Sequence, residues 1–155
     1  MHIRFASGRD IPGMIELLKQ VGQVHHEIRP DLFRAGAQKY DEGALSALLA
    51  DPNRPILIAE VSGQVAGYAF CILQLTENDP VLCDRKVLYI DDLCVEETMR
   101  GQGIATALYH KTLEFARELK CDAVTLNVWC GNDSAMKFYE RSGFKPQKVG
   151  MEVIL

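Results

Sequence analysis

A glycine-rich segment between two strongly patterned stretches restricts most severely how this chain can fold. It reads Arg100-Gly101-Gln102-Gly103-Ile104-Ala105 and follows an apolar run that ends at Val95. The stretch after it has apolar residues at helical spacing, namely Ile104, Leu108, Phe115 and Leu119, which predicts a helix that begins beside the glycines. A β-branched run at 122–128 then predicts a strand. Because strand, helix and strand imply a crossover, the two strands should lie parallel to each other.

Upstream of the glycines, the patterning is that of extended strands. Residues 55–61 and 65–73 flank the turn Ser62-Gly63-Gln64 and predict a β-hairpin, and residues 86–95 predict a third strand antiparallel to it. A short first strand is expected at 2–6 and helices at 11–18 and 38–50, whereas residues 21–31 look polar and irregular.

Downstream, Asn132-Asp133-Ser134 predicts the start of a helix that ends at Ser142-Gly143. Residues 144–155 predict a terminal extended segment or hairpin. We therefore expect an α/β (α+β) fold in which helices flank a mixed, mostly antiparallel sheet.

The composition is that of one soluble globular domain, which we expect to cover residues 1–155. The chain has a net charge of -4 and 48% hydrophobic residues, and a chain of this length can bury most of its apolar surface. No apolar run has the roughly 18 residues of a membrane helix, and the first residues lack the pattern of a signal peptide. An acidic balance argues against nucleic-acid binding, which needs a concentrated basic surface. We expect a cytoplasmic protein without nucleic-acid or membrane partners.

The cysteines predict neither disulfides nor a metal site. The chain has five, an odd number, and no two are spaced Cys-x-x-Cys; in a reducing compartment such residues are most often small buried apolar groups. His26-Glu27 begins like a zinc-protease helix, but the second histidine would fall on Pro30. We expect no metal.

The glycine turn has the properties of an anion site. Glycines allow close approach and positive φ, and the first turn of a helix presents free N–H groups and the positive end of its dipole, which suit a diphosphate. A tight turn that serves only geometry is the alternative. A dinucleotide fingerprint would need a third glycine where Thr106 stands, and a P-loop would need Gly-Lys-Ser/Thr. No Gly-x-Ser-x-Gly elbow of a hydrolase is present either.

Two blocks in a fixed order carry a family resemblance. Arg100-x-x-Gly103-x-Ala105 follows an apolar strand, and Asn132-Asp133-Ser134-Ala135 and Phe138-Tyr139-Glu140-Arg141-Ser142-Gly143-Phe144 come after it. Together they resemble the GNAT family of N-acetyltransferases over residues 55–147. The expected order of elements (strand, two helices, three strands, helix, strand, helix, two strands) is similar to the family's fold, which implies three layers with central strands splayed by a bulge.

The resemblance implies that acetyl-CoA binds between the splayed strands. The backbone amides of Gly101 to Thr106 would hold its diphosphate, and one strand would pair through its backbone with the pantetheine arm and acetyl group. The residues implied for the cofactor are Leu93, Cys94, Val95, Arg100, Gly101, Gln102, Gly103, Ile104, Ala105, Thr106, Asn127, Asn132, Ser134 and Tyr139.

Acetyl transfer to an amine needs a base, because an alkyl ammonium group with a pKa near 10.4 is protonated at pH 7. Asp91 and Asp92 are the candidates; as consecutive strand residues they should point to opposite faces, so that only one faces the cleft. Asp91 ranks first, because it lies nine residues before Arg100, where polyamine-type members of the family carry their acidic residue. The alternative is that either carboxylate is a solvent-facing, ion-paired or capping group.

The resemblance implies that Tyr139 is the general acid that protonates the leaving thiolate; packing on the sheet is its alternative. A backbone N–H near Cys94 or Val95 would polarise the thioester carbonyl. The Cys94 thiol is expected to be packed in the core and not to carry the acyl group.

The acceptor site is expected where the family builds its wall from the first two helices. The candidate residues are His25, His26, Glu27, Asp31 and Phe33, although a solvated loop would look the same. The acceptor would be a primary amine, either a small polyamine or amino-acid-like amine or a protein N-terminus or lysine, and Asp91 favours a small polycation. A non-catalytic acyl-CoA sensor and a small structural domain remain as alternatives. Exposed terminal strands would allow a homodimer.

Overall fold

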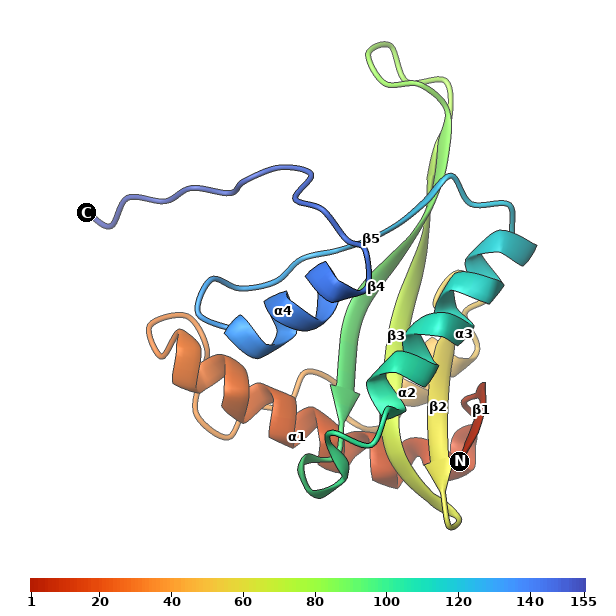
Figure 1. Cartoon of the computed structure of the whole chain (residues 1–155), viewed down its shortest axis with the longest axis vertical. Helices are drawn as coiled ribbons and strands as arrows, with labels where there is room; N and C mark the ends of the chain where they lie inside the picture. The colour runs from red at the N-terminus through yellow and green to blue at the C-terminus, as the bar shows by residue number, and fades with distance from the viewer.

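The five strands form one open sheet in the order β1-β2-β3-β4-β5, in a computed structural model that describes all residues 1–155 (Figure 1). The strands are β1 (His2–Phe5), β2 (Ile56–Val61), β3 (Gln64–Thr76), β4 (Arg85–Val95) and β5 (Ala123–Leu126). Neighbours from β1 to β4 are antiparallel, whereas β5 runs parallel to β4. The predicted mixed, mostly antiparallel sheet and its crossover are confirmed.

Helices cover both faces of the sheet and give three layers. α1 (Ile11–Ile28) and α2 (Glu42–Leu49) pack against the face that buries Ile58, Tyr68 and Cys94. α3 (Ile104–Glu118) packs against the other face, over Leu57 and Leu88. α4 (Asp133–Arg141) follows β5, and its end is tied to α3 by the Tyr109 hydroxyl, which donates to the Ser142 carbonyl at 2.7 Å. The short 3₁₀ turns η1 (Gly8–Asp10) and η2 (Glu97–Met99) precede α1 and α3.

α1 is ten residues longer than the sequence pattern indicated, so the expected irregular stretch at 21–31 is wrong as far as Ile28. Val21, Val24 and Ile28 continue the helical period of the apolar face, which outweighs the polar residues between them. Gly22 weakens helix propensity, but a Cβ there would lie 2.4 Å from the Ala37 carbonyl oxygen, so the following loop passes directly over it. No helix of the protein combines the length and apolarity needed to cross a membrane.

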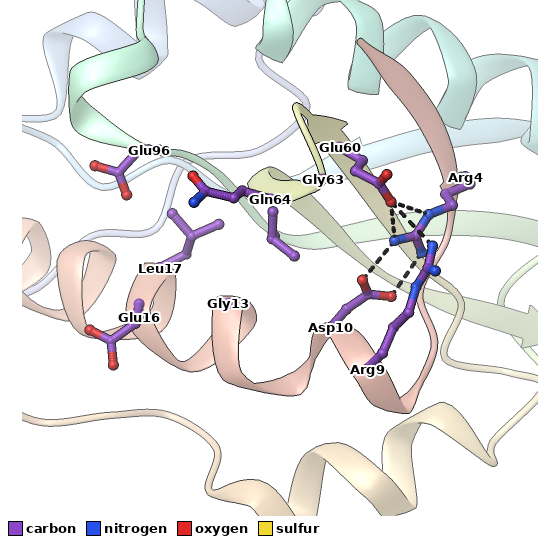
Figure 2. Close-up of a pocket in the computed structure, with 11 residues that line it drawn as sticks. Arg4, Arg9, Asp10, Gly13, Glu16, Leu17, Glu60, Gly63, Gln64 and Glu96 are labelled. Atoms are coloured by element: carbon purple, nitrogen blue, oxygen red, sulfur yellow. Dashed lines mark hydrogen bonds and ion pairs between the residues drawn. The ribbon is translucent and has the colours of Figure 1, made fainter.

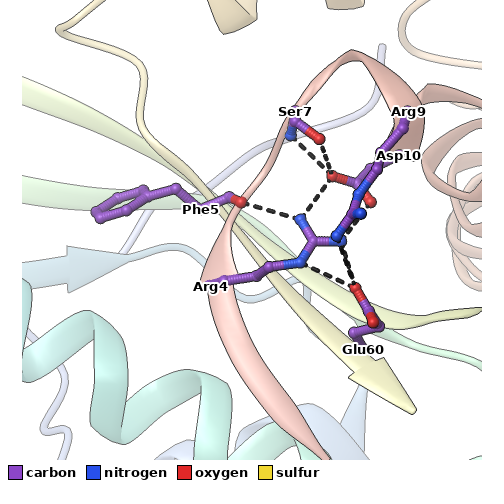
Figure 3. Close-up of polar contacts among 6 residues, drawn as sticks. All are labelled: Arg4, Phe5, Ser7, Arg9, Asp10 and Glu60. Carbon is purple, nitrogen blue, oxygen red and sulfur yellow. Dashed lines mark hydrogen bonds and ion pairs between the residues drawn. The ribbon is translucent and has the colours of Figure 1, made fainter. Parts of the chain in front are cut away.

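An ion-pair cluster fixes the start of the chain to the sheet (Figure 3). The Arg4 guanidinium donates to both carboxylate oxygens of Asp10, at 2.8 and 2.7 Å, and to Glu60 on β2 at 2.6 Å. The Ser7 backbone N–H also donates to Asp10, at 2.8 Å. Arg4 is the main cause that lowers the pKa of the buried Asp10 carboxyl to about 2. β1, η1 and β2 are therefore held by a charged contact as well as by the core.

Of the two expectations for residues 144–155, an extended segment or a hairpin, the hairpin is wrong. Residues 145–155 form neither a helix nor a strand, every one of them is exposed, and Figure 1 shows them leaving the body of the molecule after α4. We call this segment the C-terminal tail. Its only side-chain polar contact with the rest of the chain joins Glu152 to Arg29, at 2.5 Å.

Candidate functional site

The glycine turn before α3 presents a run of free backbone donors. Gly101 and Gly103 have φ of 75° and 80°, and Gly103 is the N-cap of α3 without a side-chain cap. No carbonyl accepts from the N–H groups of residues 101–106, and the first turn of α3 has no acidic residue. Six unpaired amides at the positive end of a helix dipole have the arrangement that favours a bound anion. The Arg100 Nε donates to the Val95 carbonyl at 3.2 Å and holds the turn against the end of β4.

β4 and β5 separate beside this turn. Their pairing covers only Val87–Ile90 against Ala123–Leu126, while β4 continues to Val95 with β3 on one side alone. The other edge of residues 91–95 is open, and it includes Leu93, Cys94 and Val95, the residues expected to pair with the pantetheine arm. The splayed central strands implied by the resemblance are confirmed. The open edge and the free amides fit an extended ligand that ends in a diphosphate.

A β-bulge at Asp91 changes which face the two aspartates occupy. Phe70 on β3 pairs with Asp92 and Cys71 with Ile90, so Asp91 is an extra residue without a partner. The Asp92 carboxylate accepts from the Tyr68 hydroxyl at 2.7 Å, and Asp91 accepts from Lys39 Nζ at 2.6 Å. Both contacts lie on the α1 and α2 side of the sheet. The expectation that these residues point to opposite faces is wrong, because the bulge interrupts the alternation on which it rested.

Asp92 has the properties of a base that works near neutral pH. Burial raises the pKa of its carboxyl to about 6, against the Tyr68 hydrogen bond and the nearby Lys39 charge, which lower it. Asp91 instead forms an ion pair with Lys39, and the Tyr40 hydroxyl lies 3.4 Å from the same oxygen. The two carboxylates therefore differ in their readiness to accept a proton.

Tyr139 on α4 faces the same region. Burial raises the pKa of its phenol, and the charge of Asp92 adds to the rise, so the hydroxyl stays protonated and its electrostatic partner is the candidate base. Its ring packs against Phe138 and Phe144, with centroids 5.2 and 5.5 Å apart. No hydrogen bond involves its hydroxyl, which remains free to donate.

Asn127, Asn132 and Ser134, which were also expected at the cofactor, form hydrogen bonds within the chain. Asn132 is the N-cap of α4 and accepts from the Ala135 N–H and the Ser134 hydroxyl, both at 3.3 Å. The Asn127 amide donates to the Tyr89 hydroxyl at 3.2 Å. These contacts orient the start of α4 and the end of β5, which border the gap between the strands.

The expected acceptor residues fall into two groups. His25 and Phe33 stack with ring centroids 5.0 Å apart, and Trp129 meets Phe33 at 5.3 Å; burial, and then Lys39, lower the pKa of His25. His26 Nδ1 lies 2.7 Å from the Phe33 carbonyl oxygen and supports this loop.

Glu27 and Asp31 are exposed and bound to neighbours, Glu27 to Gln23 at 3.0 Å and Asp31 to Arg29 at 2.6 Å. They do not join the aromatic cluster of His25, Phe33 and Trp129. The sequence analysis missed Trp129, Lys39 and Tyr68, which carry no motif and come from three separate segments.

Two of the hollows at the surface are lined by charged side chains. One, of about 610 Å³, opens between α3 and α4 and is basic; its lining includes Thr106, His110, Ser134, Lys137 and Arg141. Lys137 and Arg141, missed from the sequence, are spaced by one helical turn, the pattern that could have revealed them. The other, of about 480 Å³, is lined by the Arg4, Asp10 and Glu60 cluster and by Glu16 and Glu96 (Figure 2). Arg4 pairs with Asp10 and Glu60, Glu16 pairs with Lys19, and Glu96 accepts from the Gln20 amide.

The Cys94 thiol is buried and does not have the properties of an acyl carrier. Burial raises the pKa of the Cys94 thiol to about 12, so at neutral pH it stays protonated and is a poor nucleophile. No group of three or more His, Cys, Asp or Glu side chains is arranged to hold a metal ion.

Comparison with known proteins agrees with this geometry. The profile of the acetyltransferase (GNAT) family matches residues 21–144. N-acetyltransferase MJ1207 of Methanocaldococcus jannaschii is 34% identical over 92 residues, 59% of this chain and 39% of that protein. N-acetyltransferase family 8 member 2 of Rattus norvegicus is 34% identical over 77% of this chain and 53% of its own length. The chain spans 39% to 56% of the length of the first curated relatives it matches.

Solved structures share the fold. The BH1408 protein of Bacillus halodurans, in a mutant form, is 31% identical with a TM-score of 0.96, covering 100% of this chain and 99% of that one. An aminoglycoside N-acetyltransferase in complex with CoA has a TM-score of 0.73 at 15% identity, covering 99% of this chain and 98% of its own, and supports the fold alone. Since the family profile matches most of the chain, the protein belongs to the acetyltransferase (GNAT) family.

Proposed function

We propose that this chain, folded as a single domain, transfers the acetyl group of acetyl-CoA directly to a primary amine. The observation that carries the proposal is the meeting of three features at one gap in the sheet. These are the six free amides at residues 101–106, the open edge of β4, and Asp92 close enough to Tyr139 for its charge to raise the pKa of that phenol. Acetyl-CoA, when bound, supplies an activated acetyl group as a thioester.

The chain's own backbone would hold that molecule. The amides of residues 101–106 would bind the diphosphate, and the open edge of residues 93–95 would align the pantetheine arm as an added strand. Lys137 and Arg141, in the basic hollow next to Thr106, would hold the remaining phosphate. A backbone N–H of β4 at Cys94 or Val95 would donate to the developing oxyanion.

We assign the general base to Asp92 in preference to Asp91. A base must be ionised yet able to accept a proton at working pH, and a carboxyl with a pKa of about 6 meets both conditions. The Asp91 carboxylate is neutralised by Lys39 at 2.6 Å. Asp91 would therefore position Lys39 and Tyr40 beside the gap, and Asp92 would take the proton of the acceptor ammonium.

Tyr139 would return a proton to the leaving sulfur. Its phenol remains protonated because burial and Asp92 oppose ionisation, and its hydroxyl has no competing partner. Asp92 would thus act as the base that takes a proton from the acceptor ammonium, and Tyr139 as the acid that gives a proton to the leaving sulfur.

The acceptor would carry apolar surface next to its amine. The loop after α1 brings Phe33 against both His25 of α1 and Trp129, which is 41% exposed, while Lys39 places a positive charge near Asp91. An aromatic wall with a resident cation favours a monoamine with an apolar substituent over a polyamine, contrary to what Asp91 alone suggested.

Calorimetry with CoA, followed by thiol release from acetyl-CoA with a panel of apolar monoamines, polyamines and peptides, tests the proposal. The φ of 80° at Gly103 forbids a β-branched residue, so Gly103→Val should lose CoA binding. Gly150→Ala, at an exposed glycine with an ordinary φ, is the matched control and should bind normally. Absence of binding heat for the unaltered protein would refute the proposal, and binding without thiol release for any amine would indicate a non-catalytic acyl-CoA module.

A further inference from the structure

Lys39 lies where the acceptor amine is expected. It belongs to the loop between α1 and α2, and its Nζ donates to the Asp91 carboxylate at 2.6 Å. Burial raises the pKa of Asp92, and the charge of Lys39 is among the groups that oppose this rise. Burial, and then the same charge, lower the pKa of His25. The Lys39 ammonium is therefore near both the candidate base and the aromatic cluster that contains His25.

The chain on either side of Lys39 is held in place. A Cβ at Gly22 would lie 2.4 Å from the Ala37 carbonyl oxygen, so the loop is pressed against α1 just before the lysine. Just after it, the Tyr40 ring stacks on Phe70 of β3 with centroids 5.8 Å apart. The Lys39 side chain is still 45% exposed, so a reagent in the gap can reach its nitrogen. The fold thus directs this amine at the bulge of β4 and leaves it accessible.

The same strand would bring the acetyl group to this point. Asp91 is followed directly by Asp92 and by the open edge of residues 93–95, which would align the pantetheine arm and acetyl group. Consecutive strand residues rise only about 3.3 Å, so that edge begins close to the contact between Lys39 and Asp91. An amine held beside an activated acyl group reacts as if it were present at a very high concentration.

Lys39 would still need the base, as any acceptor amine does. Burial alone would lower the pKa of its ammonium, but the hydrogen bond to Asp91 and the negative charges nearby raise it above its usual value. The nitrogen is therefore protonated at neutral pH and must lose a proton before it can attack.

We propose that Lys39 is acetylated by acetyl-CoA bound to the same chain, an inference that rests on the function proposed above. The Lys39 ammonium gives one proton to Asp92, and the neutral nitrogen attacks the thioester carbonyl carbon. The C–N bond forms and the C–S bond breaks, so the leaving sulfur takes the electron pair and a proton from Tyr139. The next proton lost by the nitrogen replaces the one that Tyr139 donated. The products are acetylated Lys39, CoA and one proton, which Asp92 returns to solvent.

Peptide mass spectrometry of the protein incubated with acetyl-CoA, without an added amine, tests the proposal. Lys19 is a matched internal reference, because it is 52% exposed and is also paired with a carboxylate, Glu16, at 2.7 Å. Lys39 should gain one acetyl group at least about tenfold faster than Lys19, since only Lys39 is held beside the acyl group. The rate constant at saturating acetyl-CoA should not change when the protein is diluted, because the transfer occurs within one chain.

Asp92→Asn separates catalysed transfer from simple chemical acetylation. It should slow the acetylation of Lys39 about a hundredfold, because the base is lost, while it leaves the rate at Lys19 and the affinity for CoA unchanged. Equal rates at Lys39 and Lys19, a Lys39 rate that Asp92→Asn does not lower, or a rate constant that rises with protein concentration would each overturn the proposal. Calorimetry with CoA distinguishes the two failures. Binding heat without acetylation of Lys39 would overturn this inference alone, whereas absence of binding heat would overturn the proposed function with it.

Discussion

Replacing the candidate base should stabilise the protein. Burial raises the pKa of the Asp92 carboxyl from 3.8 to about 6. The ionised carboxylate is therefore less stable in the folded chain than in the unfolded chain. Asp92→Asn removes that charge, while its amide oxygen can still accept from the Tyr68 hydroxyl. A shift of about two pKa units at 1.36 kcal/mol each corresponds to about 3 kcal/mol. Since Asp92 is partly exposed, we expect a gain of about 2 kcal/mol in the free energy of unfolding at pH 8, or roughly 4 to 8 °C in Tm.

The sign of the effect depends on pH. Below pH 3.8 the carboxyl is neutral in the folded and the unfolded chain, so Asp92→Asn and the unaltered protein should be equally stable. Between pH 4 and 6 the Asp92 carboxyl ionises in the unfolded chain but stays mostly protonated in the folded one, so rising pH favours the unfolded state. The unaltered protein therefore loses stability over this range, whereas Asp92→Asn keeps its stability. The difference should be complete above pH 6.

Urea unfolding at pH 3.5, 5 and 8, followed by the fluorescence of Trp129 and by circular dichroism, measures the difference. Asp91→Asn is the matched control. It removes the same charge at the preceding residue but breaks the ion pair with Lys39, so it should give no gain. An Asp92→Asn variant that is no more stable at pH 8, or that gains equally at pH 3.5, would refute the burial argument. The variant should also lose turnover while it retains CoA affinity.

Three further outcomes are expected. Tyr139→Phe should lower kcat by about a hundredfold, with unchanged CoA affinity by calorimetry, because only proton donation to sulfur is lost; an unchanged kcat would remove this role. The double variant Lys137→Glu and Arg141→Glu should raise the KM for acetyl-CoA about tenfold, because charge-assisted hydrogen bonds to a phosphate are lost. It should also bind CoA and dephospho-CoA equally well. If the variant still prefers CoA, the phosphate binds elsewhere. Asp10→Asn should cost about 2 kcal/mol of stability at pH 7, and the loss should disappear as pH falls through the folded pKa of about 2, which denaturation from pH 7 to 2 would show.

Local patterns predicted the elements that are set by local chemistry. The hairpin around Gly63, the helix after Gly103 and the N-cap at Asn132 were all expected from their sequence, because turn, glycine and cap residues act on their immediate neighbours. The parallel placement of β5 followed from the strand, helix, strand crossover and was also correct.

The features that sequence analysis missed depend on distant partners. The faces of Asp91 and Asp92 are set by the register of β3 against β4. The sequence of residues 86–95 contains no signal that Asp91 is the extra residue of a bulge. A hairpin was one of the two expectations for residues 144–155, and whether such a segment forms strands depends on a partner that its own sequence does not specify. Trp129, Phe33 and Tyr40 gather near the gap only because α1 extends to Ile28 and turns the next loop back.

The bulge at Asp91 inserts one residue into β4 without shifting the pairing on either side of it. Ile90 and Asp92 pair with the adjacent residues Cys71 and Phe70, so removing Asp91 altogether would restore strict alternation while the side chains of residues 92–95 keep their present faces. The Tyr68 hydroxyl would keep its acceptor, and the ion pair with Lys39 would be lost. A single-codon deletion would therefore remove one carboxylate from this side of the sheet and leave the other in place.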